Sequence, residues 1–305
     1  MKINRKVSKR RGARSLAREV TAAVTMHGVP QDLLQNSGTI RIVSVGTERI
    51  TRGVAKLYIQ YLRVVRGKDW SDQNPSDAIA YLEMRAEAVA QSTLDVDRLA
   101  LQRVVGFEIP FVVSKVPTKL VPRAYMPLHV AVLCRFADHQ LAFSIGLSAN
   151  AGLRASELLT LAPADVLTED SRPWHESRFV GREDAFELFT VVGKGGLKRK
   201  VAIPKILALR LHQKRLAAPR SFVDREVRGL QYFDLLGGHR FSHYFSQHAT
   251  SLLGFSTGAH GLRHYFSQRR LVELQTAGLT GAEALQVLSH ELGHFSVTNT
   301  RKYLR

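Results

Sequence analysis

The first hundred residues carry apolar side chains at the three- and four-residue spacing of amphipathic helices. Seven of them fall on one face of a predicted helix: Ile50, Val54, Leu57, Tyr58, Tyr61, Leu62 and Val65. Asn74 before Pro75 predicts the start of a second helix, because proline fits the first helical turn. Ser92 with Asp95 predicts a capping box for a third helix, which runs to Val104. The stretch to about residue 105 is therefore predicted to be a small helical domain.

Proline then interrupts the helical pattern. The segment 107–127 holds four prolines and shows no helical period, and proline disfavours helix at the residue before it. We expect an extended linker over residues 113–127, between a helical domain of residues 1–112 and a second domain of residues 128–305. The second domain opens with a predicted helix from Leu128 to about Ala149.

A β-hairpin is predicted over residues 185–204. Strand-forming residues flank Gly193, Gly195 and Gly196 there, which is typical of two strands joined by a short turn. The rest of the chain to Arg305 is predicted to be helical, without an internal repeat. The expected fold class is two-domain and mainly α, with a small β-sheet in the second domain.

The charge of the chain points to a polyanionic partner. It has 44 Lys and Arg against 26 Asp and Glu, a formal net charge of +18. Both halves of the chain are basic, and residues 1–18 carry eight basic side chains and no acidic one. We expect these residues to form a basic arm, and a solvated terminus without a partner is an equal alternative.

Cys134 is the only cysteine of the chain, which excludes a disulfide framework and a cysteine-rich zinc site. Its apolar neighbours predict a small buried side chain rather than a nucleophile. No signal-peptide pattern follows the basic N-terminus, and no window approaches the roughly 18 apolar residues of a membrane span. We therefore expect an intracellular, cytoplasmic protein without a membrane segment.

A metalloprotease-like string, HELGH, occupies residues 290–294. In a zinc protease, two histidines four residues apart on a helix bind the metal, and the glutamate activates water. The extended motif needs Gly at 297 and His at 300, where this chain has Val297 and Thr300. No Asp, Glu or His follows His294 as a third ligand. We expect neither a metal site nor a cofactor.

Four other segments carry side chains that suit phosphoryl transfer without a metal. They are GLRASELLTL (152–161) with Arg154, the hairpin turn with Lys194, HGLRHYF (260–266) with His260 and Arg263, and LGHFSVTNTRKYL (292–304) with His294 and Tyr303. A phosphodiester in a pentavalent transition state carries two negatively charged non-bridging oxygens. Paired guanidinium groups neutralise such oxygens with bidentate hydrogen bonds.

The sequence resembles the tyrosine recombinase (phage integrase) family. The resemblance rests on these four boxes, which occur in the family's order and cover roughly residues 125–305. In detail the chain is most similar to integrases of bacterial integrative and mobile elements. The first domain resembles the family's helical, SAM-like core-binding domain in size and helicity, and the second would be the mixed α+β catalytic domain.

The resemblance implies a role for each residue. Tyr303 would attack the scissile phosphate to give a 3′-phosphotyrosine, while Arg154 and Arg263 would clamp the phosphate. Lys194 would protonate the departing 5′ oxygen, and His260 would assist proton transfer from Tyr303. His294 would donate a hydrogen bond to the phosphate, and Glu157 would orient the site by hydrogen bonding. Because the bond energy stays in the phosphotyrosine, rejoining needs no ATP.

Some of these residues also have a plainer interpretation. Lys194 lies near Lys198, Arg199 and Lys200, so it could belong to a solvated charge run, with Lys198 as the alternative catalytic lysine. Tyr303 alone would be a terminal aromatic side chain packed on a core. Since only two residues follow Tyr303, we expect its segment to be weakly anchored.

The function that the resemblance implies is site-specific recombination of double-stranded DNA. Four subunits would act on two DNA sites through a Holliday junction, without ATP or metal, for integration or excision of a mobile element. A type IB topoisomerase-like enzyme would share the phosphotyrosine chemistry, but it would relax DNA rather than exchange strands at a specific sequence. A catalytically silent DNA-binding regulator would share the fold, and the complete set of catalytic residue types argues against it.

Overall fold

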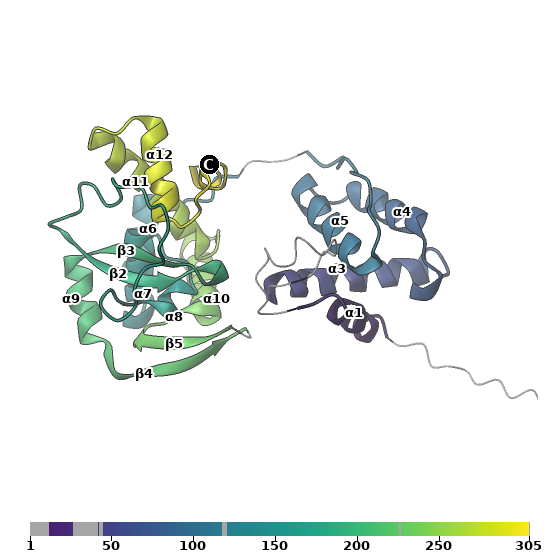
Figure 1. Cartoon of the computed structure of the whole chain (residues 1–305), viewed down its shortest axis with the longest axis horizontal. Coiled ribbons are helices and arrows are strands. Elements are labelled where there is room, and N and C mark those ends of the chain that lie inside the picture. Colours follow the sequence, from purple (N-terminus) through teal and green to yellow (C-terminus); the bar gives the residue numbers. More distant parts are fainter. Residues whose placement is uncertain (1–11, 27–41, 43–44, 118–120, 226, 305) are drawn as a thin grey trace, which may run out of the picture. The chain divides into compact units, whose positions relative to one another are not determined.

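The structure, a computed structural model, describes residues 12–26, 42, 45–117, 121–225 and 227–304. The chain divides into two compact units, Met1–Lys119 and Leu120–Arg305. The boundary between these units falls within residues 113–127, the segment predicted as a linker. Figure 1 shows the course of the chain through both units.

The first unit is helical. Its helices are α1 (Ala13–Ala22), α3 (Val45–Val64), α4 (Pro75–Ala86) and α5 (Gln91–Val105), with a 3-10 turn, η1, at Trp70–Asp72. Ala17 of α1 is buried against Ala55 and Ile59 of α3. Residues 13–18 of the predicted basic arm therefore belong to a packed helix, which corrects that prediction, and residues 1–11 lie outside the described part.

An aromatic cluster forms the core of the first unit. The ring of Tyr58 in α3 lies 5.3 Å from that of Tyr81 in α4 and 6.1 Å from that of Trp70. The apolar face predicted for the helix around residues 50–65 is only partly buried, because α3 packs through a narrower stripe than the sequence pattern suggests. Three of the seven apolar residues predicted for this face are exposed: Ile50, Leu57 and Val65.

The starts of α4 and α5 differ in how they are capped. Asn74 and Asp77 form a capping box at α4, so the predicted helix start at Asn74–Pro75 is confirmed. The capping box predicted for α5 is wrong, because its N-cap is Ala90, which makes no side-chain bond. Gln91 instead binds the following extended segment, donating to the Val112 carbonyl at 3.1 Å and accepting from the Ser114 N–H at 2.8 Å.

The second unit combines helices with two small sheets. Its helices are α6 (Pro127–Arg135), α7 (His139–Ala151), α8 (Glu157–Thr160), α9 (Lys205–Gln213), α10 (Gly238–Leu253), α11 (His260–Thr276), α12 (Gly281–Glu291) and α13 (Val297–Arg301), followed by a 3-10 turn, η3, at Lys302–Leu304. The prediction of a single helix from Leu128 to Ala149 is wrong, because the chain breaks between α6 and α7. Asp138 starts α7 after the break, since its carboxylate accepts from the backbone N–H groups of Gln140 and Leu141 in the first turn.

Two antiparallel sheets complete the second unit. β1 (Ala162–Pro163), β2 (Phe186–Val192) and β3 (Lys198–Pro204) form one sheet in that order. The predicted hairpin is thus confirmed, with β2 and β3 joined by a 3-10 turn, η2, at Lys194–Gly196. β4 (Arg215–Asp224) and β5 (Val227–Phe233) form the other sheet, where the sequence predicts helix. That prediction is wrong. The strands gave no signal in the sequence because β4 is mostly exposed and lacks the apolar alternation of a half-buried strand.

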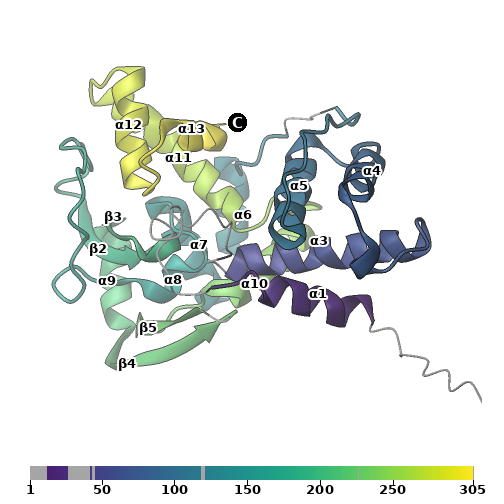
Figure 2. The same ribbon diagram turned by 45° about the vertical axis from the view of Figure 1, so that its right-hand side comes forward.

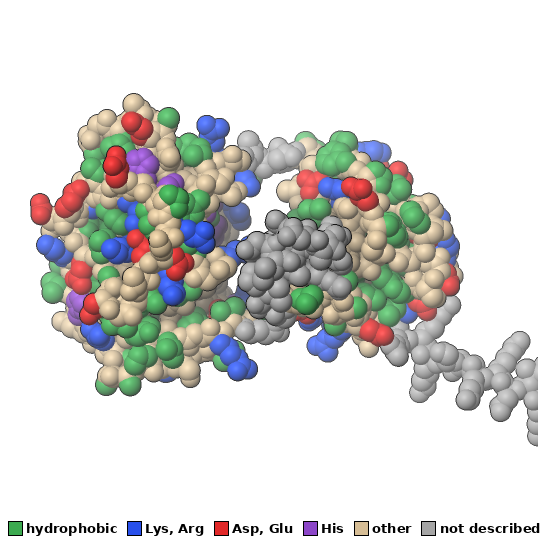
Figure 3. Space-filling model, viewed as in Figure 1, with side chains coloured by type: hydrophobic (Ala, Val, Ile, Leu, Met, Phe, Trp, Pro, Cys, Tyr) green, Lys and Arg blue, Asp and Glu red, His purple; other side chains and the backbone are tan. Residues whose placement is uncertain are grey.

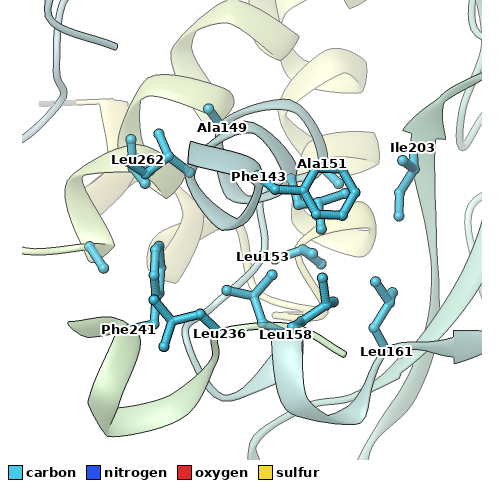
Figure 4. Close-up of a cluster of buried hydrophobic side chains, with 14 of the residues drawn as sticks. Phe143, Ala149, Ala151, Leu153, Leu158, Leu161, Ile203, Leu236, Phe241 and Leu262 are labelled. Atoms are coloured by element: carbon cyan, nitrogen blue, oxygen red, sulfur yellow. The ribbon is translucent and has the colours of Figure 1, made fainter. Parts of the chain in front are cut away.

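The main core of the second unit lies between the first sheet and helices α7, α8 and α10. Figure 4 shows Phe143, Leu158, Ile203 and Phe241 within this cluster. A smaller apolar cluster joins α11 to α12. These two helices lie at one end of the unit, and the β4–β5 hairpin lies at the opposite end (Figures 1 and 2).

The predicted fold class, mainly α with a small β-sheet, is confirmed, and the second unit holds two such sheets rather than one. Within the described residues, no helix is both long enough and apolar enough to cross a membrane. The face of the second unit drawn in Figure 3 carries basic, acidic and apolar side chains side by side.

The end of α7 generates a prediction about stability. Gly152 has a φ of 62°, and a Cβ placed on it would lie 2.5 Å from the Phe266 ring. Gly152→Ala should lower the free energy of unfolding by about 2–4 kcal/mol, the sum of a strained backbone and an overpacked contact. Gly254→Ala is the matched control, because Gly254 ends α10 with a φ of 77° and open space around its Cβ. It should cost only the backbone strain, about 1–2 kcal/mol, and equal losses in urea unfolding would contradict the steric argument.

Candidate active site

Five of the six predicted catalytic residues come together in the second unit. They are Arg154 from the turn before α8, His260 and Arg263 from α11, His294 from the turn after α12, and Tyr303 from η3. Hydrogen bonds and ring contacts join these side chains. Lys194, the sixth, lies on the hairpin turn η2.

The centre of this cluster is the fully buried carboxylate of Glu157. Three guanidinium nitrogens surround it: Arg154 Nη1 at 2.6 Å, Arg199 Nη2 at 2.8 Å and Arg263 Nη1 at 3.5 Å. Burial alone would raise the pKa of this carboxyl group. The three positive charges and a hydrogen bond from the Arg154 backbone outweigh burial and lower the pKa to about 2. Glu157 is therefore an anion at neutral pH.

One carboxylate and three guanidinium groups leave the cluster with a net charge of +2. Arg263 is buried, and its Nη groups also donate to the backbone oxygens of Gly152 and Leu292. Burial, together with the charges of Arg154 and Arg199, lowers the pKa of Arg263 to about 9, so the side chain stays protonated at neutral pH. A surplus of positive charge in a buried site favours an anionic ligand.

The His294 ring lies where Arg154 and Arg263 converge. Its Nε2 is 3.1 Å from Arg154 Nη2 and 3.5 Å from Arg263 Nη2, and its Nδ1 is 3.2 Å from Thr300 Oγ1. Because a guanidinium group can only donate, Nε2 accepts and Nδ1 carries the proton. Burial and the nearby positive charges lower the pKa of His294 to about 3. The ring is therefore neutral in the free protein.

The Tyr303 side chain is buried beside these groups. Its ring is stacked on that of His294 at a centroid distance of 5.1 Å, and the Arg263 guanidinium carbon lies 5.6 Å from its centroid. The next residue, Leu304, packs against the apolar cluster between α11 and α12. The segment is thus packed onto the unit, and the expectation of a weak anchor is wrong.

Two histidines one turn apart on α11 complete the surroundings of Tyr303. The ring centroids of His260 and His264 lie 5.2 Å and 4.7 Å from that of Tyr303. Partial burial and the charge of Arg263 lower the pKa of His260 to about 4, which leaves a neutral base at neutral pH. His260 is exposed, whereas His294 is half-buried.

Lys194 is exposed on the hairpin turn, and no hydrogen bond or ion pair within the described part of the chain joins it to the cluster. The hairpin turn nevertheless starts at the cluster. A Cβ placed on Gly193 would lie 3.2 Å from Glu157 Oε1 and 3.7 Å from Arg154 Nη1. Lys194 is thus one residue from the site, and its flexible four-carbon stem can turn the ammonium group toward it.

The HELGH string does not have the geometry of a zinc protease. Since α12 ends at Glu291, His290 and His294 do not share a helix face. His290 Nδ1 accepts from the His175 backbone N–H at 2.9 Å, and Glu291 binds Arg270 at 2.8 Å. The described residues contain no group of three metal-binding side chains.

Sequence reasoning missed one member of the cluster, Arg199, which it grouped with the neighbouring lysines as a charge run. Along β3 the side chains of Arg199, Val201 and Ile203 are all buried. The two-residue period that places Val201 and Ile203 in the core could have placed Arg199 there as well. From the sequence, His264 is expected to be structural or to contact DNA rather than to be catalytic, although its spacing of four residues from His260 predicts the same helix face.

Comparison with models of known protein families finds no match, and comparison with curated protein sequences finds none either. Solved structures do match over most of the chain. One of them is a post-cleavage complex of the XerH site-specific recombinase bound to palindromic difH substrate. It matches with a TM-score of 0.55 at 13% identity, over 85% of this chain and 75% of that one. The chain has the tyrosine recombinase fold.

Other structures with the tyrosine recombinase fold match to a similar degree. A lambda integrase tetramer bound to a Holliday junction has a TM-score of 0.52 at 15% identity, over 95% of this chain and 76% of that one. XerH bound to difH substrate in a pre-cleavage complex has a TM-score of 0.51 at 15% identity, over 85% and 76%. The resemblance carried by the four sequence boxes is thus confirmed for the fold.

The neutral state of His294 predicts a pH dependence of stability. The pKa of an unfolded histidine is about 6.5, so a lower folded pKa adds stability above that pH, which is lost as the pH falls toward 3. The urea concentration at the unfolding midpoint should therefore decrease as the pH is lowered from about 7 to 5. His294→Asn should make this decrease less steep, by the slope that corresponds to about one proton taken up on unfolding. His139→Asn, which removes an exposed histidine at the start of α7, is the matched control. Identical slopes for the unaltered protein and His294→Asn would contradict the assignment.

Proposed function

We propose that the chain is a site-specific recombinase that cleaves and rejoins double-stranded DNA through a 3′-phosphotyrosine intermediate. The observation that supports this most is the convergence of Arg154 and Arg263 on one acceptor position beside the Tyr303 ring. A phosphodiester at that position would present its negative oxygens to both guanidinium groups and its phosphorus to the tyrosine hydroxyl.

The charge of the cluster suits the transition state better than the ground state. A phosphodiester carries one negative charge, whereas its pentavalent transition state carries two, which matches the net charge of +2 around Glu157. Interactions that strengthen only in the transition state raise the rate. Arg154 keeps 23% of its side chain exposed, while Arg263 is fully buried. The phosphate would therefore enter from the side of Arg154.

Phosphate binding would change the role of His294. In the free protein its Nε2 accepts from both arginines. An anionic oxygen that takes over this acceptor position favours a proton on Nε2, because an opposite charge raises the pKa of a histidine. His294 would then donate to the phosphate, and it would do so only after DNA is bound.

The remaining residues would move protons. As Tyr303 Oη bonds to phosphorus and the bond to the 5′ oxygen breaks, the phenolic proton passes to neutral His260 and Lys194 protonates the leaving oxygen. Rejoining reverses these steps, with the 5′ hydroxyl as nucleophile and Tyr303 as leaving group. Glu157 would hold Arg154 and Arg263 in place without touching the DNA. The chemistry needs neither ATP nor a metal ion.

The assembly would be a synapse of four subunits on two DNA sites that passes through a Holliday junction. The net charge of +18 supports a DNA partner. The similar structures include a recombinase in a post-cleavage complex and an integrase tetramer on a Holliday junction. Integration or excision of a mobile element, by a cytoplasmic enzyme that acts on cellular DNA, is the role that the sequence resemblance supports.

The first test of this function concerns the nucleophile. Tyr303→Phe keeps the ring and its packing but removes the hydroxyl, so duplex binding should survive while the covalent protein–DNA adduct disappears. Tyr265→Phe is the matched control, because Tyr265 packs against the main core of the second unit, and it should leave adduct formation unchanged. Denaturing gels on a nicked suicide substrate separate the outcomes. An adduct that persists in Tyr303→Phe would exclude Tyr303 as the nucleophile.

The second test concerns the charge. If about eight phosphates are neutralised, log K should fall with log[salt] at a slope near −7, roughly 0.9 per contact. Affinity would then drop on the order of 10⁴-fold over a roughly fourfold rise in salt. Fluorescence anisotropy with a labelled target duplex measures this slope. A slope shallower than about −2 would mean that the basic charge is not directed at DNA.

A further inference from the structure

Arg199 occupies a junction to which the proposed mechanism assigns only a positive charge. Its side chain is 1% exposed. Nη2 donates to Glu157 Oε2 at 2.8 Å, and Nη1 donates to the backbone oxygen of Glu291 at 2.9 Å. One planar guanidinium group thus joins the carboxylate that holds both phosphate-clamping arginines to the last residue of α12, three positions before His294.

The α12 end of this bridge is itself held in place. The Glu291 carboxylate accepts from Arg270 Nη2 at 2.8 Å and Nε at 3.0 Å, and from the Phe179 backbone N–H at 2.9 Å. Both Arg270 and Glu291 are buried. The Glu291 carbonyl is therefore a fixed point, and Arg199 transmits its position to Glu157.

The turn that carries His294 packs directly on the Arg199 side chain. Gly293 has a φ of 69°, and a Cβ placed on it would lie 2.8 Å from Arg199 Cδ. Arg199 also belongs to the hairpin that carries Lys194, since it pairs with Val191 across β2 and β3. A shift of Arg199 would thus disturb the arginine pair, the His294 turn and the lysine hairpin together.

We propose that Arg199 is a positioning residue of the phosphate site, which sets the spacing between the Arg154–Arg263 pair and the segment that carries His294 and Tyr303. This inference rests on the proposed function of that site. Arg199 acts through Glu157 and Glu291 and does not touch the DNA, because its two Nη groups are both engaged in the bridge.

The bridge needs a guanidinium group and not simply a positive charge. A planar fork holds two acceptors at once in fixed directions, whereas lysine offers a single nitrogen. Arg199→Lys keeps the charge and loses the fork, and Arg199→Met loses both. Lys200→Met is the matched control, because it removes one positive charge from the next residue of the same strand without touching the cluster.

The kinetic test is single-turnover adduct formation on a nicked suicide duplex at saturating DNA. Arg199→Met should slow this step on the order of 100-fold, and Arg199→Lys by about tenfold or more, the loss expected when reacting groups are slightly misplaced. Duplex affinity should stay unchanged in both variants, and Lys200→Met should react at the rate of the unaltered protein. Unaltered rates in the Arg199 variants would overturn the proposal. If Arg199→Met does not fold, Arg199→Lys decides this test.

A measurement without DNA keeps the inference separate from the proposed function. After burial, Arg263 and Arg154, the charge of Arg199 also lowers the pKa of His294. An NMR titration of the His294 ring should therefore give a higher pKa in Arg199→Met and an unchanged pKa in Lys200→Met. An unchanged pKa in a folded Arg199→Met variant would overturn the positioning role. Absence of any adduct with the unaltered protein would instead reject the proposed function and leave this titration as the test of the bridge.

Discussion

A single carboxylate shared by three guanidinium groups sets the arrangement of the second unit. Taking an ion out of water costs several kcal/mol, and only close pairing offsets that cost. Glu157 therefore requires Arg154, Arg199 and Arg263 within hydrogen-bonding distance, and they require it, because without it three like charges would face one another in a buried site. The start of α8, strand β3 and helix α11 are tied together by this requirement.

The ion pairs also depend on glycine at two turns where backbone and side chains come close. Gly152 and Gly293 both adopt positive φ, and a Cβ on either would overlap a neighbouring side chain. Gly152 and Leu292, which precedes Gly293, offer their carbonyl groups to Arg263. Steric fit at these glycines therefore decides where the guanidinium group lies, and its position in turn decides where an anion can bind.

The sequence predicts local features better than their assembly. The hairpin around Gly193 and the helix start at Asn74 follow from nearby residues, and the four boxes name most of the site. The break at Asp138 was missed because the apolar period continues across it, and the β4–β5 pair was missed because exposed strands carry little periodicity. Arg199 was missed for a different reason. The two-residue period of β3 was a local signal for its burial, but its partner Glu157 lies 42 residues away and its neighbours are lysines.

The protonation states in the free protein bear on when the site can react. Burial, together with the positive charge that would bind a phosphodiester, keeps His294 neutral, so its Nε2 fills the position where a phosphate oxygen would lie. The Tyr303 ring is already packed against this ring, so the tyrosine lies beside the site in the free protein. In the proposed mechanism the missing element is therefore the negative charge of the DNA. Its arrival both displaces the histidine nitrogen and favours the proton that lets this nitrogen donate. Binding and activation would then be the same electrostatic event, which would confine nucleophilic attack to protein with DNA in place.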